Sequence, residues 1–317
     1  MCGIICGSSY RDLTPLLMGG LKRLEYRGYD SAGIAVVDEN RALQRRRSAG
    51  KVHRLSEEIE REAIRGLTGI AHTRWATHGA PETRNAHPHQ SGDHLAVVHN
   101  GIVENFSALR DLLENQGYEF TSETDTEVIA HLLSHYLGRH GNLLAAVQAA
   151  MQQLKGAFTF AVIHREEPER LVVARQGTPL VIGVGDGEAF AASDTYALLP
   201  LAQRFVFMED GDVADICCGS IRIYDTEQNP VERREETVSH NADPTDKAGY
   251  RHYMRKEIDE QSHVVEGTIG AWISGGAISD ERLPERARLS IAQTDSVEII
   301  ACGTSYHSAL TAAYLFE

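Results

Sequence analysis

The chain opens with Met1-Cys2-Gly3-Ile4-Ile5, which places a cysteine directly behind the initiator methionine and ahead of an apolar run. A residue as small as cysteine at this position favours removal of the methionine, and Cys2 would then carry both a thiol and a free α-amine. An unperturbed thiol titrates near pH ~8.5 and an α-amine near ~8, so both groups can react close to neutrality after a modest shift. An amine that takes the proton of its own thiol makes a nucleophile with a built-in base. The alternative is that Cys2 merely begins a strand.

Length and composition limit what the chain can be. Its 317 residues suffice for two domains that each bury a core, and 42% hydrophobic with 24% charged residues is ordinary for a soluble globular protein. The formal net charge is −14, from 31 basic and 45 acidic residues, which disfavours a nucleic-acid or anionic-membrane surface. No apolar run is long enough to span a membrane and no signal peptide is visible, so we expect a cytoplasmic protein with no nucleic-acid or membrane partner.

The cysteines and histidines predict neither a disulfide framework nor a metal site. Five scattered cysteines, an odd number without metal-ligand spacing, indicate a reducing compartment. Cys6 shares a strand face with Cys2, but four rises of ~3.3 Å separate them by ~13 Å, which is too far for a disulfide. We therefore expect Cys6 to be buried and inert, and Cys217-Cys218 to pack within a strand. The fifteen histidines, His87-Pro88-His89 among them, lack a nearby cluster of cysteines or carboxylates, so we expect no structural metal.

Hydrophobic periodicity predicts a layered first domain. Apolar residues recur at helical spacing in several segments of the first half of the chain, and alternating or continuous apolar runs dominate from residue 157. We expect helices at 13–24, 52–64, 105–116, 125–138 and 142–154, and strands at 2–9, 32–38, 68–73, 95–99, 157–164, 171–175, 180–184, 189–193, 205–208, 213–216 and 221–224. Asn100-Gly101 is a strong turn dipeptide and is expected to end its strand. This order of elements favours two packed sheets with helices on the outside.

The last third of the chain has a different character. Residues 226–249 are polar and charged and are expected to form a linker, followed by a helix over 251–272. A buried-type strand, Val297–Ala301, leads into Cys302-Gly303-Thr304-Ser305 and a helix from about Tyr306. A strand, loop and helix of this kind begin a parallel α/β sheet, and the helix N-terminus suits an anion such as phosphate. One such unit cannot complete a doubly wound domain, so we expect the second domain to be incomplete.

Four separated motifs together resemble the class II glutamine amidotransferases. They are Cys2-Gly3-Ile4, Arg74-Trp75-Ala76-Thr77-His78-Gly79, His99-Asn100-Gly101 and Thr124-Asp125-Thr126-Glu127. Each is weak alone, but their order and approximate spacing match the family. The resemblance implies an α+β fold, the four-layer αββα sandwich of the N-terminal-nucleophile hydrolases, over residues 2–225. One departure is Cys6, because family members usually have Gly or Ala there.

The resemblance implies a catalytic role for three residues. The Cys2 thiol would attack the side-chain amide of glutamine and form a thioester, with its own amine moving the proton to the departing ammonia. The Asn100 side-chain amide and the Gly101 N–H would stabilise the negative oxygen of the intermediate. The alternative for Asn100-Gly101 is a simple hairpin turn.

The remaining predicted residues would hold the substrate. Arg74 suits the α-carboxylate of glutamine and Asp125 suits the α-ammonium, although Asp125 is also a candidate helix N-cap. Trp75, Thr77 and His78 belong to a loop that folds over glutamine in the family; packing, capping and turn formation are their alternatives. Arg27 would brace the nucleophile or make a surface salt bridge.

Further motifs narrow the resemblance to the branch that passes ammonia to fructose 6-phosphate and makes glucosamine 6-phosphate. They are Leu24-Glu25-Tyr26-Arg27-Gly28-Tyr29-Asp30-Ser31-Ala32-Gly33, Tyr250-Arg251-His252-Tyr253-Met254-Arg255-Lys256-Glu257-Ile258 and Cys302-Gly303-Thr304-Ser305. Residues 250–317 would then begin a sugar-isomerase (SIS-type) domain, with Thr304 and Ser305 as part of a sugar-phosphate site. The resemblance also implies a homodimer through this domain and no cofactor or metal.

Two other functions stay open from the sequence. A non-catalytic glutamine-binding module would keep Arg74 and Asp125 but would not need a free N-terminal cysteine. Another class II amidotransferase would share the first domain only. We expect this chain to hydrolyse glutamine but not to transfer ammonia to the sugar, because the remaining sugar-binding segments and the base are expected beyond residue 317.

Overall fold

The computed structural model describes residues 2–76, 78–237, 249–270, 272–274, 277–278 and 283–316. Thr77, one of the predicted site residues, lies outside the described residues. The chain divides into two compact units, residues 1–245 and residues 246–317.

The first sheet of the first unit contains the amino-terminal strand in its interior. Its strands are β1 Gly3–Ser8, β2 Ser31–Val37, β3 Leu43–Ala49, β4 Thr68–Arg74, β9 Val181–Val184, β10 Ala189–Ala192, β11 Arg204–Phe207 and β15 Glu235–Thr237. Their spatial order is β15-β11-β9-β10-β1-β4-β2-β3, and the neighbouring strands run antiparallel. β1 therefore lies between β10 and β4, so its position is set by hydrogen bonds on both sides.

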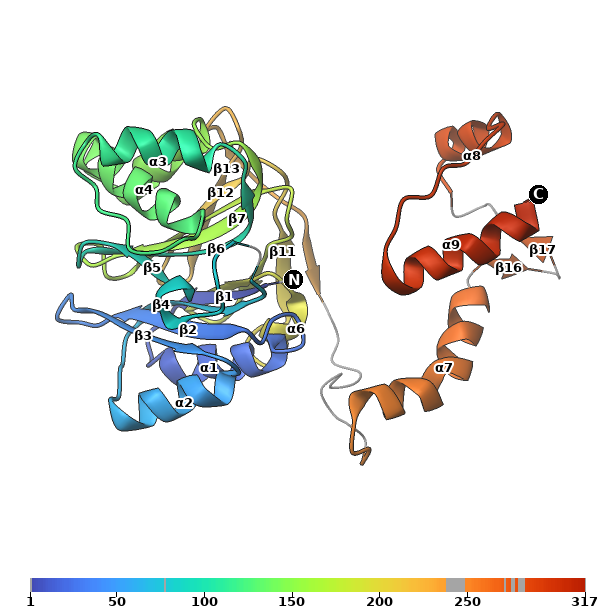
Figure 1. Ribbon diagram of the computed structural model, residues 1–317, viewed down its shortest axis with the longest axis horizontal. Coiled ribbons are helices and arrows are strands. Elements are labelled where there is room, and N and C mark those ends of the chain that lie inside the picture. Colours follow the sequence, from blue (N-terminus) through green and yellow to red (C-terminus); the bar gives the residue numbers. More distant parts are fainter. Residues whose placement is uncertain are drawn as a thin grey trace. The chain divides into compact units, whose positions relative to one another are not determined.

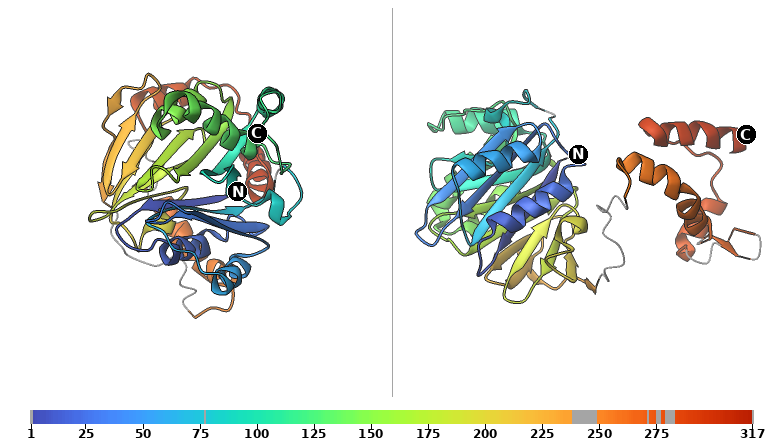
Figure 2. Two further views of the ribbon diagram at one scale, coloured as in Figure 1. Left: turned by 90° about the vertical axis from the view of Figure 1, so that its left-hand side faces the viewer. Right: turned by 90° about the horizontal axis from the view of Figure 1, so that it is seen from below.

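The second sheet is also antiparallel. Its strands are β5 His89–Ser91, β6 Leu95–Val103, β7 Gly156–His164, β8 Arg170–Gln176, β12 Val213–Cys217, β13 Ser220–Tyr224 and β14 Pro230–Val231. Their spatial order is β14-β13-β12-β8-β7-β6-β5. The two sheets stack face to face, as Figure 1 and the left view of Figure 2 show.

Helices cover the outer face of each sheet (Figure 1). Those on the first sheet are α1 Thr14–Leu24, α2 Val52–Arg61 and α6 Thr195–Leu198, and those on the second are α3 Phe106–Glu114, α4 Thr126–His140 and α5 Leu143–Met151. The unit is thus a mixed α/β structure of four layers, helix–sheet–sheet–helix. Because both faces of each sheet are covered, the central strands are apolar on both faces.

Alternation along β1 shows how the strand serves two cores at once. Ile4 and Cys6 lie in the core between the sheets, whereas Ile5 lies in the core under α1 and α2. Cys6 is fully buried and its thiol donates to the Ala191 carbonyl oxygen at 3.3 Å. The five cysteines, all of them among the described residues, are free. The expectation of a buried Cys6 without a disulfide is confirmed.

Most predicted elements of residues 2–225 form within a few residues of the predicted bounds. The prediction of a turn at Asn100-Gly101 was wrong. β6 continues through both residues to Val103, and Gly101 pairs with Phe158 on β7. Gly101 has φ +117°, and a Cβ there would collide with the Ala157 carbonyl oxygen. Glycine therefore permits a local distortion of a continuing strand instead of a chain reversal.

The expected linker 226–249 contains two short strands. β14 pairs with β13 and β15 pairs with β11, so the sheets of the first unit extend past residue 225. Three short or polar elements, β3, β5 and α6, were not predicted either. β3 is the edge strand of the first sheet, is partly exposed and carries Arg45-Arg46-Arg47. A polar strand of this kind has no hydrophobic periodicity from which it could be predicted.

In the second unit the structure describes three helices and a pair of short antiparallel strands. Its elements are α7 Tyr253–Gly270, β16 Ile273–Ser274, β17 Ala277–Ile278, α8 Glu285–Ala292 and α9 Gly303–Phe316. The predicted strand 297–301 is absent: this segment is irregular, and Ile300 is 91% exposed. A strand needs a neighbour for its backbone hydrogen bonds, and the described residues provide none beside this segment. Among the helices of the described ranges, none is long and apolar enough to cross a membrane.

Candidate active site

Cys2 lies immediately before β1, beside the loop that follows β4. Gly3 on β1 is opposite Thr73 on β4, which brings residue 2 level with the residues after that strand. The Trp75 N–H donates to Cys2 Sγ at 3.2 Å, and the Cys2 thiol faces the Trp75 carbonyl oxygen at 3.4 Å. Because side chains alternate along a strand, Cys2 shares the inner sheet face with Cys6.

Burial sets the protonation of the Cys2 thiol. Desolvation raises the pKa of Cys2 above its ordinary value, although the Trp75 N–H and the positive charge of Arg74 oppose the shift. The negative charge of Asp125 acts in the same direction as burial. The thiol is therefore protonated at neutral pH, and a reaction at its sulfur requires a base to accept the proton.

The Asn100 side chain reaches Cys2 from the second sheet. Its Nδ2 donates to the Cys2 carbonyl oxygen at 3.3 Å, and its Oδ1 lies 3.0 Å from His72 Nε2. Burial lowers the pKa of His72 to about 3, so the ring is neutral and carries one proton. Since Oδ1 can only accept, that proton belongs on Nε2. His72 therefore holds the Asn100 amide with its N–H groups directed toward Cys2.

Arg74 ends β4 and is only 3% exposed. Its guanidinium donates to the carbonyl oxygens of Ala80 at 3.3 Å, Gly79 at 3.4 Å and His78. Arg74 therefore binds the backbone of the loop that follows it. Burial lowers its pKa, while Cys2, Asp30 and Asp125 partly offset that shift because their negative forms favour the cation.

Asp125 immediately precedes α4 but does not cap it with its side chain. Its Oδ2 instead accepts from the Val103 N–H of β6 at 2.9 Å. The helix start is held by Glu127, whose carboxylate accepts the N–H groups of Thr121 and Ser122. Burial opposes the charge of Glu127, but these hydrogen bonds lower its pKa overall. The side-chain N-cap considered for Asp125 is not formed, which leaves its carboxylate directed at the neighbouring sheet.

One small cavity brings the predicted residues together. Six of them line it: Cys2, Arg74, Trp75, His78, Gly101 and Asp125. Asn100 contacts Cys2 beside this cavity. The free volume is about 20 Å³, which is room for roughly one water. The cavity is therefore too small for an amino acid, and lining residues must move before one can enter.

The loop after β4 is attached at both ends by carboxylates. Asp30 Oδ2 accepts the Ala76 N–H at 2.8 Å, and Glu123 Oε2 accepts the Ala80 N–H at 3.4 Å. Trp75, directly before the first of these attachments, is 44% exposed and makes an edge contact with Tyr29 at a ring-centroid distance of 5.4 Å. A loop fixed at its ends and exposed at its aromatic residue can fold over a ligand without losing its attachments.

Sequence reasoning missed a cluster of buried histidines at the cavity, two of which, His87 and His99, help to line it. His99 Nδ1 lies 2.9 Å from Thr126 Oγ1, which lies 3.3 Å from His87 Nε2. The His87 ring stacks on His72 with centroids 4.1 Å apart. Burial lowers the pKa of these histidines and of His89, so they are neutral. The only signal in the sequence was the spacing of His87, His89 and His99 around an apolar strand, which does not show that they meet.

Arg27 forms an ion pair and does not line the cavity. Its Nη2 lies 2.8 Å from Asp194 Oδ2, and its side chain is 15% exposed. The next residue, Gly28, has no room for a side chain, because a Cβ would lie 2.7 Å from the Arg74 carbonyl carbon. Of the two alternatives predicted for Arg27, the ion pair is formed, and a role as a brace for the nucleophile stays a prediction.

Thr304 and Ser305 belong to the second unit and lie in the first turn of α9. Both are exposed. The helix begins at Gly303, earlier than predicted, so the two hydroxyls stand on the helix itself and not on a preceding loop.

Comparison with known proteins identifies similar domains and relatives. A family model described as "Glutamine amidotransferase domain" matches residues 72–200, which include the end of β4, the whole of β6 and the whole of α4. The chain carries a glutamine amidotransferase domain. The amidotransferase domain is similar to the glutamine phosphoribosylpyrophosphate amidotransferase from B. subtilis complexed with ADP and GMP, with a TM-score of 0.63 and 27% identity over 72% of this chain and 50% of that one.

Curated relatives match the amidotransferase domain and the second unit together. The chain is homologous over its whole length to proteins named glutamine–fructose-6-phosphate aminotransferase [isomerizing]. It is 52% identical to that of Idiomarina loihiensis, 51% to that of Shewanella oneidensis and 50% to that of Yersinia pseudotuberculosis. Each match covers 100% of this chain and 52% of the relative, so the chain spans about half the length of the curated relatives it matches.

Proposed function

We propose that this chain hydrolyses L-glutamine to glutamate and ammonia through a thioester on Cys2. In the complete enzyme, the ammonia would convert fructose 6-phosphate to glucosamine 6-phosphate. The observation that carries the proposal is the convergence of Cys2, Arg74, Gly101 and Asp125 on one cavity, with the Asn100 amide beside it. The names of the relatives, at about 50% identity, favour this reaction over that of the phosphoribosylpyrophosphate enzyme at 27%.

The first chemical step is attack of Cys2 Sγ on the amide carbon of glutamine. Because burial raises the pKa of this thiol, the proton must pass to a base as the sulfur attacks. After removal of Met1, the α-amine of Cys2 is on the same residue and supplies that base. The amine then gives the proton to the departing nitrogen, so ammonia leaves and a thioester remains. Water attacks the thioester, releases glutamate and restores the thiol.

The negative oxygen formed in each step needs hydrogen-bond donors that are already in place. The Asn100 Nδ2 group is held toward Cys2 by His72, and the backbone of Gly101 lines the same cavity. Donors that need no rearrangement stabilise the transition state more than the neutral substrate. Asn100 and Gly101 are accordingly assigned as the oxyanion hole.

Recognition of free glutamine falls to the two charged residues of the cavity. Arg74 would release the carbonyl oxygens of residues 78–80 and bind the α-carboxylate in two parallel hydrogen bonds. Asp125 keeps one oxygen on the Val103 N–H and offers the other to the α-ammonium. Trp75, Thr77 and His78 would close over the bound amino acid. Because Arg74 would exchange the loop carbonyl oxygens for the α-carboxylate, the loop would move when an α-amino acid binds.

Residues 250–317 are proposed to begin the sugar-isomerase domain of the longer enzyme. Thr304 and Ser305 lie on the amino-terminal turn of a fourteen-residue helix, where unpaired N–H groups and hydroxyls suit a phosphate. Dimerisation of the longer enzyme would run through this domain. The chain by itself is expected to form no glucosamine 6-phosphate from glutamine and fructose 6-phosphate, and detection of that product by mass spectrometry would refute this part of the proposal.

The decisive experiment measures glutamate release by the purified chain, by Cys2→Ala and by Cys6→Ala. The Cys6 thiol is buried on the same strand and serves as the matched control. We expect loss of activity only in Cys2→Ala, and an intact mass that shows the wild-type chain beginning at Cys2. Glutamine binding without turnover in a chain that retains Met1 would instead identify a glutamine-binding module.

A further inference from the structure

A pair of adjacent cysteines forms the tip of the β12–β13 hairpin. Cys217 ends β12 and is paired with Ser220 at the start of β13. The two residues between them have positive φ, +45° for Cys218 and +80° for Gly219, as a two-residue type I′ turn requires. The expectation that both cysteines pack within a strand was therefore wrong for Cys218, which is exposed in the turn. Asn, Asp or Gly is the usual residue at such a position, so a thiol there is unusual.

The hairpin tip is held by the far end of β1. The Cys218 N–H donates to Ser8 Oγ at 3.2 Å, and the Ser8 hydroxyl donates to the Glu169 carbonyl oxygen at 2.8 Å. Gly219 packs against the β9–β10 turn so closely that a Cβ would lie 2.7 Å from the Gly187 carbonyl carbon. One buried hydroxyl thus fixes the backbone of Cys218 relative to that of Glu169.

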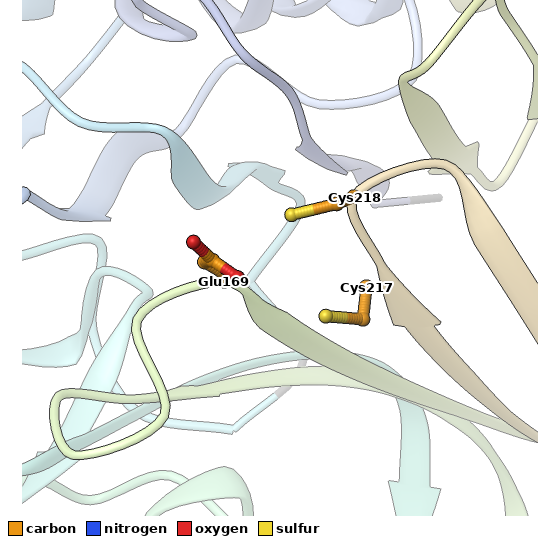
Figure 3. A group of neighbouring side chains, drawn as sticks. All are labelled: Glu169, Cys217 and Cys218. Carbon is orange, nitrogen blue, oxygen red and sulfur yellow. The ribbon is translucent and has the colours of Figure 1, made fainter.

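Three potential ligand atoms meet at this tip (Figure 3). The sulfurs of Cys217 and Cys218 and a carboxylate oxygen of Glu169 all lie within 4.8 Å of one another. In Figure 3 both sulfurs point from the hairpin toward the Glu169 side chain. This is the one such group of histidine, cysteine and acidic side chains found in the part of the chain that the structure describes. Cys217 is partly exposed and the other two residues are exposed, so a solvated ion can reach the group.

The spacing suits a tetrahedral ion that prefers sulfur. Two sulfurs bound at ~2.3 Å in tetrahedral geometry are about 3.8 Å apart, and a sulfur and a carboxylate oxygen are about 3.5 Å apart. The three ligand atoms lie within 4.8 Å of one another, so they would have to approach each other by about 1 Å to bind one ion. Exposed side chains can make this movement by rotation about their side-chain bonds. Two thiolates and one carboxylate also match the charge preference of a thiophilic dication.

Nearby charge does not oppose a cation strongly. Arg170 is close enough to Cys217 to influence it electrostatically, but its guanidinium is already paired with Glu167 and with Asp215, whose Oδ1 lies 3.0 Å from Arg170 Nε. The positive charge of Arg170 is therefore balanced by two carboxylates. Desolvation, Glu169 and the neighbouring thiol together raise the pKa of Cys218 to about 11, so the thiol is protonated until an ion replaces the proton.

We propose that Glu169, Cys217 and Cys218 form a binding site for a thiophilic divalent cation of the Zn²⁺ class. Each thiol releases one proton to solvent when its sulfur binds, the carboxylate supplies the third ligand, and a water completes the tetrahedron. No electron transfer is involved. The ion would join the start of β8 to the β12–β13 hairpin. Six strand rises of ~3.3 Å place Ser8 ~20 Å from Cys2, so the site is separate from the cavity that holds Cys2.

Cobalt(II) titration of the reduced chain tests the site, because thiolate coordination to Co²⁺ produces a charge-transfer band. We expect a band that saturates at one Co²⁺ per chain and disappears when Zn²⁺ is added. Cys217→Ser and Cys218→Ser should each lose the band at equimolar metal, and Glu169→Gln should need more metal to reach it. Cys2→Ala and Cys302→Ser are the controls, since they remove the active-site thiol and an exposed cysteine of the second unit, and both should keep the band.

A second measurement separates loss of the site from loss of folding. Zn²⁺ should raise the thermal midpoint of the wild-type chain and of Cys2→Ala, because an ion that binds only the folded state stabilises it. The double variant Cys217→Ser/Cys218→Ser should unfold cooperatively and hydrolyse glutamine like wild type, but its midpoint should not respond to Zn²⁺. A band that persists in the double variant, no band in wild type, or a Cys217–Cys218 disulfide in the reduced protein would each overturn the proposal.

Discussion

Single residues at the cavity depend on partners that belong to other strands. The Asn100 amide has two chemically different ends, and it faces Cys2 correctly only because His72 occupies the carbonyl end. His72 can do this because burial keeps its ring neutral, with its one proton on the nitrogen next to Asn100. Orientation of the predicted oxyanion donor therefore originates on β4, while the donor itself is on β6.

Removal of the Asn100 amide should reduce turnover more than binding. We expect Asn100→Ala to lower kcat for glutamine hydrolysis by about 100- to 1000-fold, with a much smaller change in KM, because the donor acts mainly on the negative oxygen of the transition state. Steady-state glutamate release measures both constants. Asn40→Ala, on an exposed turn, is the control and should match wild type. A large rise in KM with unchanged kcat would assign Asn100 to substrate binding.

The raised pKa of Cys2 predicts the direction of the pH dependence. Below that pKa, the thiolate fraction grows about tenfold for each pH unit, and the free amine fraction grows in the same direction. We therefore expect kcat/KM for glutamine to rise between pH 6 and pH 8. Initial rates in buffers of constant ionic strength measure this profile. A flat or falling profile over that range would contradict a buried, protonated thiol as the resting nucleophile.

At the scale of elements, β6 is the strand that makes the site possible. It continues through Asn100 and Gly101, and so carries one predicted donor toward Cys2 and places the other at the cavity. Its end also donates the Val103 N–H to Asp125, which ties the start of α4 to the same strand. A turn at Asn100-Gly101 would have separated these three contacts.

Substitution of Gly101 tests whether the distortion of β6 is required. Gly101→Ala meets both a positive φ and a collision with the Ala157 carbonyl oxygen. Gly117→Ala has the unfavourable positive φ of +88° but no collision, because no atom lies within 4 Å of its added Cβ. We expect the control to cost roughly 1 kcal/mol and Gly101→Ala to cost about 1–3 kcal/mol more. Urea unfolding measures the difference, and equal costs would mean that β6 adjusts freely.

At the scale of the whole unit, the buried histidines couple stability to pH. Burial lowers the pKa of His72, His87, His89 and His99 below the ordinary value near 6.5. The unfolded chain therefore takes up more protons than the folded chain as the pH falls below ~6.5. Stability is fully present above that pH and is lost progressively below it, by up to about 1.4 kcal/mol per pH unit for each such histidine.

Replacement of one cluster histidine should reduce this pH dependence. We expect the free energy of unfolding of His89→Asn to fall less between pH 7.5 and pH 5.5 than that of wild type. His53→Asn, exposed on α2, is the control and should fall as wild type does. Urea unfolding at the two pH values measures all three chains. Identical slopes for His89→Asn and wild type would show that His89 takes up its proton equally well in the folded state.

The sequence was sufficient for what depends on local patterns. Alternating and helical periodicity located most strands and helices of residues 2–225, because each pattern reports a face that is buried in one element. The motif residues were recognisable together, because their order and approximate spacing match the family although each motif is weak alone. The two-sheet architecture followed from the order of these elements.

Only the tertiary structure decided what depends on contacts between distant segments. A continuing β6 needs β7 beside it, and the histidine cluster needs four segments to meet. Arg74 is bound by its own loop, and the cavity is smaller than an amino acid, because packing fills space that no motif describes. Val297–Ala301 has the composition of a buried strand but remains irregular without a described neighbour. The physical reason is the same throughout: a residue's type restricts its chemistry, whereas its partners are chosen when the chain folds.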